Sequence, residues 1–566
     1  MRKLFVSLLL AVVSAVATAV PVDRQHALLS AHKILPGKRL SEASLPTAAR
    51  KRMKAANASE APAFYVFNAT DGKGFVLVAG DDAFPEFLGY SETGTFHEDA
   101  ELPCGLAVFL ESYTRYVSDV RAGRAEAPDR RAALRRVPKA SVSPLLTCSF
   151  GQDEPYNLLC FDANNNPCPC GCVATAVAQI MYYWQWPKVR TGKTGYDWSA
   201  VFPTTEENLA SPDASGIISQ ICKDIGTAVG MSYSPAGSGA QSNRVVEALA
   251  DRFGYVPSTL RHQWRLCFAS TDDWMKVIKT ELSAGRPIYF SASSTTGTGS
   301  DAAGHAFVVD GYNESGMVHV NWGWDGGFNG NYDIVQMNPQ AYSFINEQTI
   351  ITGIQPNRSD LTGTPQYFMQ MRSAPTVNDG KSKTQSKTLA FTVTTNNIYN
   401  LTSITQDWEY TIGIFDTSLQ LLGDINSDRA TPSANLASNR YYPEGSVNCK
   451  LSAYGDGDYV LRVIFRDKGS DTWRLPDMAG GDTANMIPIR IANKKVTFYA
   501  EGVEIITGID RVSDFAQGEG NTRLTVYSLD GHVLYAGAPE GFSLSQMKGH
   551  GVLIVRSGHE TRKIAY

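Results

Sequence analysis

The chain has 566 residues, of which 43% are hydrophobic, 19% charged and 10% aromatic. At about 150 residues per domain, this length predicts several folded units, and the composition excludes a wholly disordered protein. The 51 Lys and Arg residues against 56 Asp and Glu residues give a net charge of −5. Because the chain as a whole has no positive field that would hold a polyanion, we expect no nucleic acid partner.

The first 19 residues are typical of an export signal. Two basic residues precede an apolar run over residues 4–16, and Ala17-Thr18-Ala19 offers a cleavage site of small residues. No later stretch approaches the roughly 20 apolar residues that a membrane span needs. We therefore expect residues 1–19 to be removed and the protein to be secreted or held at the cell surface, without a membrane span.

Residues 20–140 are predicted to form an α+β propeptide. After a helix-favouring start, two short apolar runs at 64–68 and 75–80 are joined by Asp71-Gly72-Lys73-Gly74, which predicts a β-hairpin. Basic residues recur from Arg115 to Lys139 among Ala and Pro, which indicates an exposed linker, with a solvated charged helix as the alternative. Paired basic residues in an exposed segment are easily cut, so the residues before it form a candidate removable segment.

Residues 141–356 mix helical and strand patterns, which predicts an α+β domain. Apolar side chains recur at helical spacing from Cys172 to Trp186, and the pattern stops before Pro187. Strands are predicted at 287–291, 306–312 and 317–322.

Beyond residue 357 the apolar pattern alternates every second residue. It does so at 388–394, 408–415 and 459–465, which predicts an all-β sandwich over residues 357–500. Residues 501–566 carry a further set of predicted strands, including 524–528, 533–535 and 551–556.

Cys172 is the first candidate for chemistry. It follows Gly171 at the start of the predicted helix, where unsatisfied N–H groups and the helix dipole favour a negative charge and so ease ionisation of a thiol. A thiolate nucleophile needs a base that can also protonate the leaving group, and His is the side chain suited to this near neutral pH. His305 is the preferred partner because small residues, Ala302-Ala303-Gly304, precede it at the start of an apolar strand.

Three further residues complete the candidate site. An antiparallel return strand would bring the amide of Asn321 near His305 and orient its ring, and Trp322 would shelter the pair from water. The side chain of Gln152 and the backbone N–H of Cys172 are candidate donors to an oxyanion. The resulting chain order of Gln, Cys, His and Asn is that of the papain-like cysteine peptidases.

Four blocks of the sequence resemble the streptopain family of secreted cysteine peptidases. They read QDEPYN at 152–157, GCVATAVAQIMYY at 171–183, GHAFVVDG at 304–311 and HVNWGW at 319–324, while FVLVAGDD at 75–82 resembles that family's inhibitory propeptide. The resemblance implies a papain-like catalytic domain and synthesis as a zymogen that its own propeptide inhibits. It also implies cleavage of protein or peptide substrates, with Cys172 as nucleophile and His305 as general acid and base. Gln152 would then serve the oxyanion hole, and Asn321 and Trp322 would orient and shield the histidine.

The sequence departs from the family pattern in two places. Asp325 stands where Gly is usual after Trp324, which would reshape the loop over the histidine. Cys168 and Cys170 crowd the nucleophile, so that disulfide exchange with Cys172 is conceivable. We expect a disulfide among four neighbouring cysteines rather than a zinc site, because a single residue separates each close pair; they are Cys148, Cys160, Cys168 and Cys170. No metal or cofactor is expected.

Residues 501–566 resemble the sorting domains of type IX secretion substrates, which implies the type IX secretion machinery as a partner. Two other functions stay open. The same thioester chemistry would serve a transglutaminase-like acyl transferase, in which an amine replaces water. Alternatively, the β-rich C-terminal half would serve a non-enzymatic surface adhesin.

Overall fold

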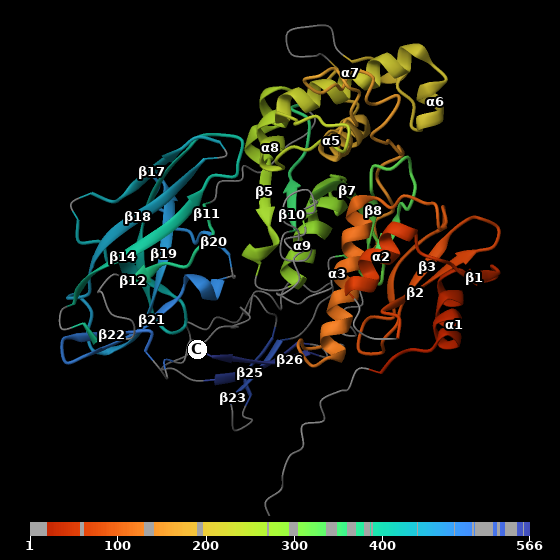
Figure 1. The fold of residues 1–566 in the computed structure, drawn as a ribbon. Helices are drawn as coiled ribbons and strands as arrows, with labels where there is room; N and C mark the ends of the chain where they lie inside the picture. Colours follow the sequence, from red (N-terminus) through yellow and green to blue (C-terminus); the bar gives the residue numbers. More distant parts are fainter. Residues whose placement is uncertain are drawn as a thin grey trace, which may run out of the picture. The chain divides into compact units, whose positions relative to one another are not determined.

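The computed structural model describes residues 20–56, 61–128, 141–188, 196–268, 271–293, 304–334, 348–358, 369–377, 385–386, 389–428, 430–438, 440–479, 482–500, 503, 524–528, 533–537, 552–557 and 560–565. The predicted export signal lies outside these residues. The chain divides into two compact units, Met1–Tyr367 with Leu401–Ile404, and Phe368–Asn400 with Thr405–Tyr566 (Figure 1). In the described part of the chain, no helix combines the length and the apolar character that crossing a membrane requires.

In its described residues, the first unit begins with three helices and four strands. These are α1 (Arg24–Ile34), β1 (Leu40–Glu42), α2 (Thr47–Ala56), β2 (Phe64–Ala69), β3 (Phe75–Ala79), β4 (Phe87–Ser91) and α3 (Cys104–Arg121). The carboxylate of Asp23 caps α1 by accepting the N–H groups of Gln25 and His26. The predicted hairpin is confirmed, since β2 and β3 pair antiparallel with Phe64 opposite Ala79.

The prediction of an exposed linker from Arg115 onward is wrong for the first residues of that stretch. Residues 115–121 form the last turns of α3, in which Tyr116 and Val117 are buried. Arg115 is partly exposed and pairs with Glu111, whereas Arg121 is nearly buried in an ion pair with Asp81. The apolar stripe that continues from Tyr113 at helical spacing lies against the sheet. The linker's later part, residues 129–140, lies outside the described residues.

The part of the remaining first unit that the structure describes supplies five α-helices and six strands. They are α5 (Cys172–Trp184), α6 (Thr205–Leu209), α7 (Pro212–Val229), α8 (Asn243–Asp251), β5 (Arg261–Trp264), α9 (Thr271–Ser283), β6 (Ile288–Ser293), β7 (Gly304–Tyr312), β8 (Val318–Asn321), β9 (Gly330–Tyr332) and β10 (Thr349–Thr352). The predicted helix and the three predicted strands are confirmed as α5, β6, β7 and β8, as is the α+β class.

One sheet runs through the whole first unit, in the order β1-β2-β3-β4-β9-β8-β7-β6-β10-β5. Its two parts meet where β4 pairs with β9, with Gly89 opposite Tyr332. One face of the sheet packs against α3 and α9, and the other against α5, α7 and α8 (Figure 1). Because successive residues of a strand point to opposite faces, Phe307 and Val309 join the first core while Ala306 and Val308 join the second.

The second unit is all β. Two sheets, with orders β12-β14-β11-β20 and β13-β22-β21-β19-β15-β16, share one hydrophobic core that includes Val393 of β14 and Trp408 of β15. This confirms the predicted sandwich. Its strands are β11 (Gln370–Met371), β12 (Thr376–Val377), β13 (Gln385–Ser386), β14 (Ala390–Tyr399), β15 (Gln406–Phe415), β16 (Leu421–Asp424), β17 (Ser433–Leu436), β18 (Tyr441–Lys450), β19 (Gly457–Asp467), β20 (Asp477–Met478), β21 (Ile487–Ala492) and β22 (Lys495–Phe498).

A further four-stranded sheet follows near the C-terminus. Its order is β24-β23-β25-β26, and its strands are β23 (Leu524–Ser528), β24 (Val533–Gly537), β25 (Val552–Ser557) and β26 (Glu560–Ala565). These are the strands expected at the end of the chain, with β26 as an addition.

Candidate active site

Cys172 is the first residue of α5, and its side chain is partly buried. Gly171 before it has φ 93°, and a Cβ there would lie 3.0 Å from the sulfur of Met231, so the turn into the helix requires glycine. The sulfur accepts hydrogen bonds from the backbone N–H groups of Val173 and of Ala306 in β7. Burial nevertheless raises the pKa of the Cys172 thiol, so in this state the nucleophile is protonated.

His305 is the second residue of β7 and is buried. Its Nε2 lies 3.1 Å from the carbonyl oxygen of Trp322, and its ring centroid lies 6.1 Å from that of Phe307 and 6.4 Å from that of Trp322. Burial lowers the pKa of His305 to about 4, with the Trp322 carbonyl opposing this shift, so the imidazole is neutral near pH 7. The structure therefore holds a neutral thiol and a neutral imidazole rather than an ion pair.

The two side chains lie on different faces of the sheet. Ala306, whose N–H faces the sulfur of Cys172, belongs to the core beneath α5, whereas the ring of His305 packs with Phe307 and Trp322 in the core beneath α3. The backbone of β7 thus lies next to the sulfur, while the imidazole points away from it.

Gly105 in the first turn of α3 covers the imidazole. A Cβ at this position would lie 2.8 Å from Cδ2 of His305 and 2.7 Å from Cζ3 of Trp322, so only glycine lets the helix approach these rings. Gly105 is not among the residues predicted from the sequence. A glycine near the start of an otherwise apolar helix is unfavourable, and such a residue is a signal of close packing.

The structure does not bring the amide of Asn321 to His305. In the β7–β8 register Asn321 lies opposite Val308, its Nδ2 donates to the carbonyl of Cys148 at 2.8 Å, and its Oδ1 accepts the N–H of Gly323 at 3.1 Å. Trp322, in contrast, is fully buried and contacts the imidazole.

The backbone of Gln152 is hydrogen-bonded to the segment that leads to the nucleophile Cys172. Its carbonyl accepts the N–H of Cys170 at 2.8 Å, two residues before Cys172, and its side chain is partly exposed. This places Gln152 beside the turn that leads into α5.

The expected disulfide is not formed. Cys148, Cys160, Cys168 and Cys170 all carry free thiols. The sulfur of Cys168 faces the carbonyl of Asn166 at 3.3 Å. That of Cys170 lies 3.3 Å from the hydroxyl of Thr175 and also contacts the thiol of Cys222. Among the described residues, no group of three or more His, Cys, Asp or Glu side chains is arranged to hold a metal ion.

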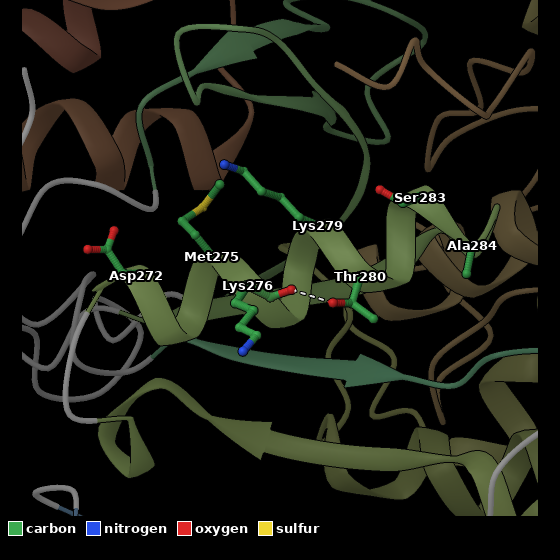
Figure 2. A pocket seen from close by; sticks show the side chains of 7 residues that line it. All are labelled: Asp272, Met275, Lys276, Lys279, Thr280, Ser283 and Ala284. Atoms are coloured by element: carbon green, nitrogen blue, oxygen red, sulfur yellow. Dashed lines mark hydrogen bonds between the residues drawn. The ribbon is translucent and has the colours of Figure 1, made fainter. Parts of the chain in front are cut away.

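An open pocket also lies along helix α9 (Figure 2). It is lined by Asp272, Met275, Lys276, Lys279, Thr280, Ser283 and Ala284. The hydroxyl of Thr280 donates to the carbonyl of Lys276 at 2.7 Å, and the ammonium of Lys279 lies 5.5 Å from the ring centroid of Tyr312. Since its lining contains neither Cys172 nor His305, we assign this pocket no part in the chemistry.

Two family models match the first unit. The model of the peptidase C10 family matches residues 150–332, and the model of the Spi protease inhibitor matches residues 19–117. The first match spans Gln152, Cys172, His305, Asn321 and Trp322, and the second spans Gly105.

Curated relatives and solved structures resemble the same region. The thiol protease/hemagglutinin PrtT of Porphyromonas gingivalis is 32% identical over 404 residues, 64% of this chain and 45% of PrtT, so the chain spans less than half of that relative. Streptopain of Streptococcus pyogenes is 31% identical over 336 residues, 52% of this chain and 80% of streptopain. A prointerpain A fragment from Prevotella intermedia has a TM-score of 0.45 and 28% identity, covering 53% of this chain and 98% of the fragment.

Proposed function

The chain belongs to the peptidase C10 family, and we propose that it is a cysteine endopeptidase that is made as a zymogen and acts outside the cell on protein substrates. The observation that carries the proposal is the position of Cys172 at the start of α5, with its sulfur against the backbone N–H of the residue that follows His305. Export would depend on residues 1–19, and sorting by the type IX machinery would depend on residues 501–566.

In the proposed reaction, His305 takes the proton of the Cys172 thiol, and the sulfur attacks the carbonyl carbon of the scissile peptide bond. The N–H of Cys172 and the side chain of Gln152 stabilise the oxyanion that forms. The imidazolium then donates its proton to the leaving amine, and an acyl-enzyme remains. Water, activated by His305, hydrolyses this thioester and restores the thiol. Trp322 shields the imidazole from solvent during these steps, and Asn321 orients the ring once the active arrangement has formed.

We infer that residues 20–140 keep the enzyme latent by holding the imidazole in the core beneath α3. Gly105 lies against the ring, and the carbonyl oxygen of Trp322 lies within hydrogen-bond distance of its Nε2. Removal of α3 uncovers this side of the ring, which frees the start of β7 to rearrange so that His305 reaches the sulfur. The thiol proton then moves to the imidazole, and solvent that reaches the pair lowers the free energy cost of forming the two charges.

Digestion of casein tests the proposal directly. The matured wild-type protein should cut it into fragments visible in a mass spectrum, and Cys172→Ala should reduce this activity more than about a thousandfold because the nucleophile is lost. A matched control is Cys267→Ala, which removes another partly buried thiol and should leave the activity unchanged. Cross-linked casein in place of fragments would favour acyl transfer, and a fully active Cys172→Ala protein would refute the assignment of the nucleophile.

A further inference from the structure

Asp325 is held in an unusual conformation between two loops of the candidate site. It follows Trp324 with φ 52°, in the left-handed region that side chains seldom adopt. Its Oδ1 accepts the hydroxyl proton of Thr205, the first residue of α6, at 2.5 Å. Asp is among the few side chains that tolerate this region, and the contact with Thr205 fixes its carboxylate in one orientation.

The same carboxylate belongs to a chain of hydroxyl groups. The hydroxyl of Tyr156 lies 2.9 Å from Oγ1 of Thr205. Since Thr205 gives its proton to Asp325, Tyr156 must donate to Thr205. Asp325, Thr205 and Tyr156 thus link the loop after β8, the start of α6 and the segment that follows Gln152.

Asp325 also contacts the residues just before Gln152. Its backbone N–H donates to the carbonyl of Phe150 at 3.2 Å. A Cβ on Gly151 would lie 2.1 Å from Oδ1 of Asp325, so the carboxylate lies directly against the backbone of Gly151. Any larger residue at position 151 would displace one of the two.

The inner side of this segment is fixed by the helix that carries the nucleophile. The N–H of Phe150 donates to Oε1 of Gln179 at 3.2 Å, and the carbonyl of Gly151 accepts the hydroxyl of Thr175 at 3.1 Å. Both partners belong to α5. The segment before Gln152 is therefore held between α5 on one side and Asp325 on the other.

We propose that Asp325, oriented by Thr205, is a positioning residue that fixes the segment 150–152 and thereby sets the distance between the Gln152 side chain and the oxyanion formed at Cys172. The proposal rests on the proposed function, because it assigns Asp325 an effect only through Gln152. A hydrogen-bond donor to an oxyanion contributes fully only when it already lies in place, so a loosened segment would reduce kcat more than substrate binding.

A double-mutant cycle tests this assignment. Asp325→Gly suits the left-handed backbone and removes the carboxylate, and Thr205→Val removes only the hydroxyl. Each should lower kcat about tenfold, a part of the about 100- to 1,000-fold cost of deleting an oxyanion donor, and should leave KM within about twofold. In a Gln152→Ala background, the same substitutions should lower kcat by less than about twofold, because the donor that they position is absent.

Three controls make the outcome decisive. Titration with an irreversible thiol-directed inhibitor normalises each rate to the amount of competent enzyme. Thr205→Ser should retain most of the wild-type kcat, and Thr227→Val, which removes an exposed hydroxyl bonded only within α7 to the carbonyl of Lys223, should have no effect.

Equal losses with and without Gln152 would overturn the inference while leaving the proposed function intact, as would an unimpaired Asp325→Gly enzyme. An unimpaired Gln152→Ala enzyme would refute the oxyanion role and the inference together. Activity that persists in Cys172→Ala would refute the proposed function itself.

Discussion

At the scale of single residues, the latent state depends on which way the side chain of His305 points. Its ring lies among Phe307, Trp322 and Gly105, whereas the next residue along the strand faces the sulfur of Cys172. The latent arrangement and a catalytic pair therefore differ at the start of β7, where the imidazole must leave the core beneath α3 to meet the sulfur. The sequence predicts both residues, because each occupies a recognisable local setting. It does not predict the orientation of the ring, because that depends on α3, about 200 residues earlier in the chain.

Acid should destabilise the latent precursor. The pKa of His305 is about 4 in the folded precursor against an ordinary value of 6.5, so between these values the unfolded chain binds a proton that the folded chain excludes. The stabilisation is complete above pH 6.5 and is lost as the pH falls toward 4. We expect the melting temperature of a Cys172→Ala precursor to fall over this range.

Adding His305→Gln should remove part of that fall. Burial also lowers the pKa of His262 to about 4, so His262→Gln should remove another part, whereas His32→Gln, at an exposed position, should change nothing. The melting temperatures of the four proteins at pH 7 and pH 5 provide the comparison. Unchanged pH dependence in the His305→Gln precursor would show that the ring is not buried as a neutral group.

At the scale of secondary structure, α3 is the element that covers the imidazole of His305. Its first turn carries Gly105, and its last residue, Arg121, is anchored far from the site by a nearly buried ion pair with Asp81 at 2.9 Å. The guanidinium also donates to the carbonyls of Ala61, Pro62 and Gly80. This anchor joins the end of α3 to the β2–β3 hairpin and so fixes the helix that covers His305.

Arg121→Ala should destabilise the Cys172→Ala precursor by about 3–5 kcal/mol, because it leaves the carboxylate of Asp81 buried without its cation. A matched substitution in the same helix is Arg115→Ala, which breaks the partly exposed pair with Glu111 and should cost less than about 1 kcal/mol. Urea unfolding of both variants measures the difference. Equal costs would show that the Arg121 anchor does not hold α3.

The sequence predicts elements well where their periodicity is strong. The α5 helix and strands β6, β7 and β8 have clear apolar patterns bounded by turn residues, and all four are present. The end of α3 was misread because its basic residues concealed the apolar stripe of Tyr113, Tyr116 and Val117. The charge of Arg121 suggested exposure, yet its partner Asp81 lies 40 residues earlier, and no local pattern indicates such a pair.

At the scale of the whole molecule, the segment that matches the Spi inhibitor model and the segment that matches the peptidase C10 model share one sheet and one core. Strand β4 pairs with β9 across more than 200 residues of chain, and the core beneath α3 contains Phe109 and Tyr113 together with Phe307 and Trp322. The length of the chain predicts several separate folded units. The shared sheet could not be predicted, because strand partners distant in sequence carry no local signal. The consequence is that latency and folding of the first unit depend on the same contacts.

The rate at which iodoacetamide alkylates Cys172, followed by the mass of its peptide from pH 4 to 10, tests most directly whether the propeptide keeps the nucleophile and its base apart. In the matured chain we expect reaction already near pH 5, because a thiolate is stabilised by the His305 imidazolium. In the intact precursor we expect appreciable reaction only above the ordinary thiol pKa of 9.0, since burial raises that of Cys172. Equal reactivity of the two forms near pH 5 would contradict the account.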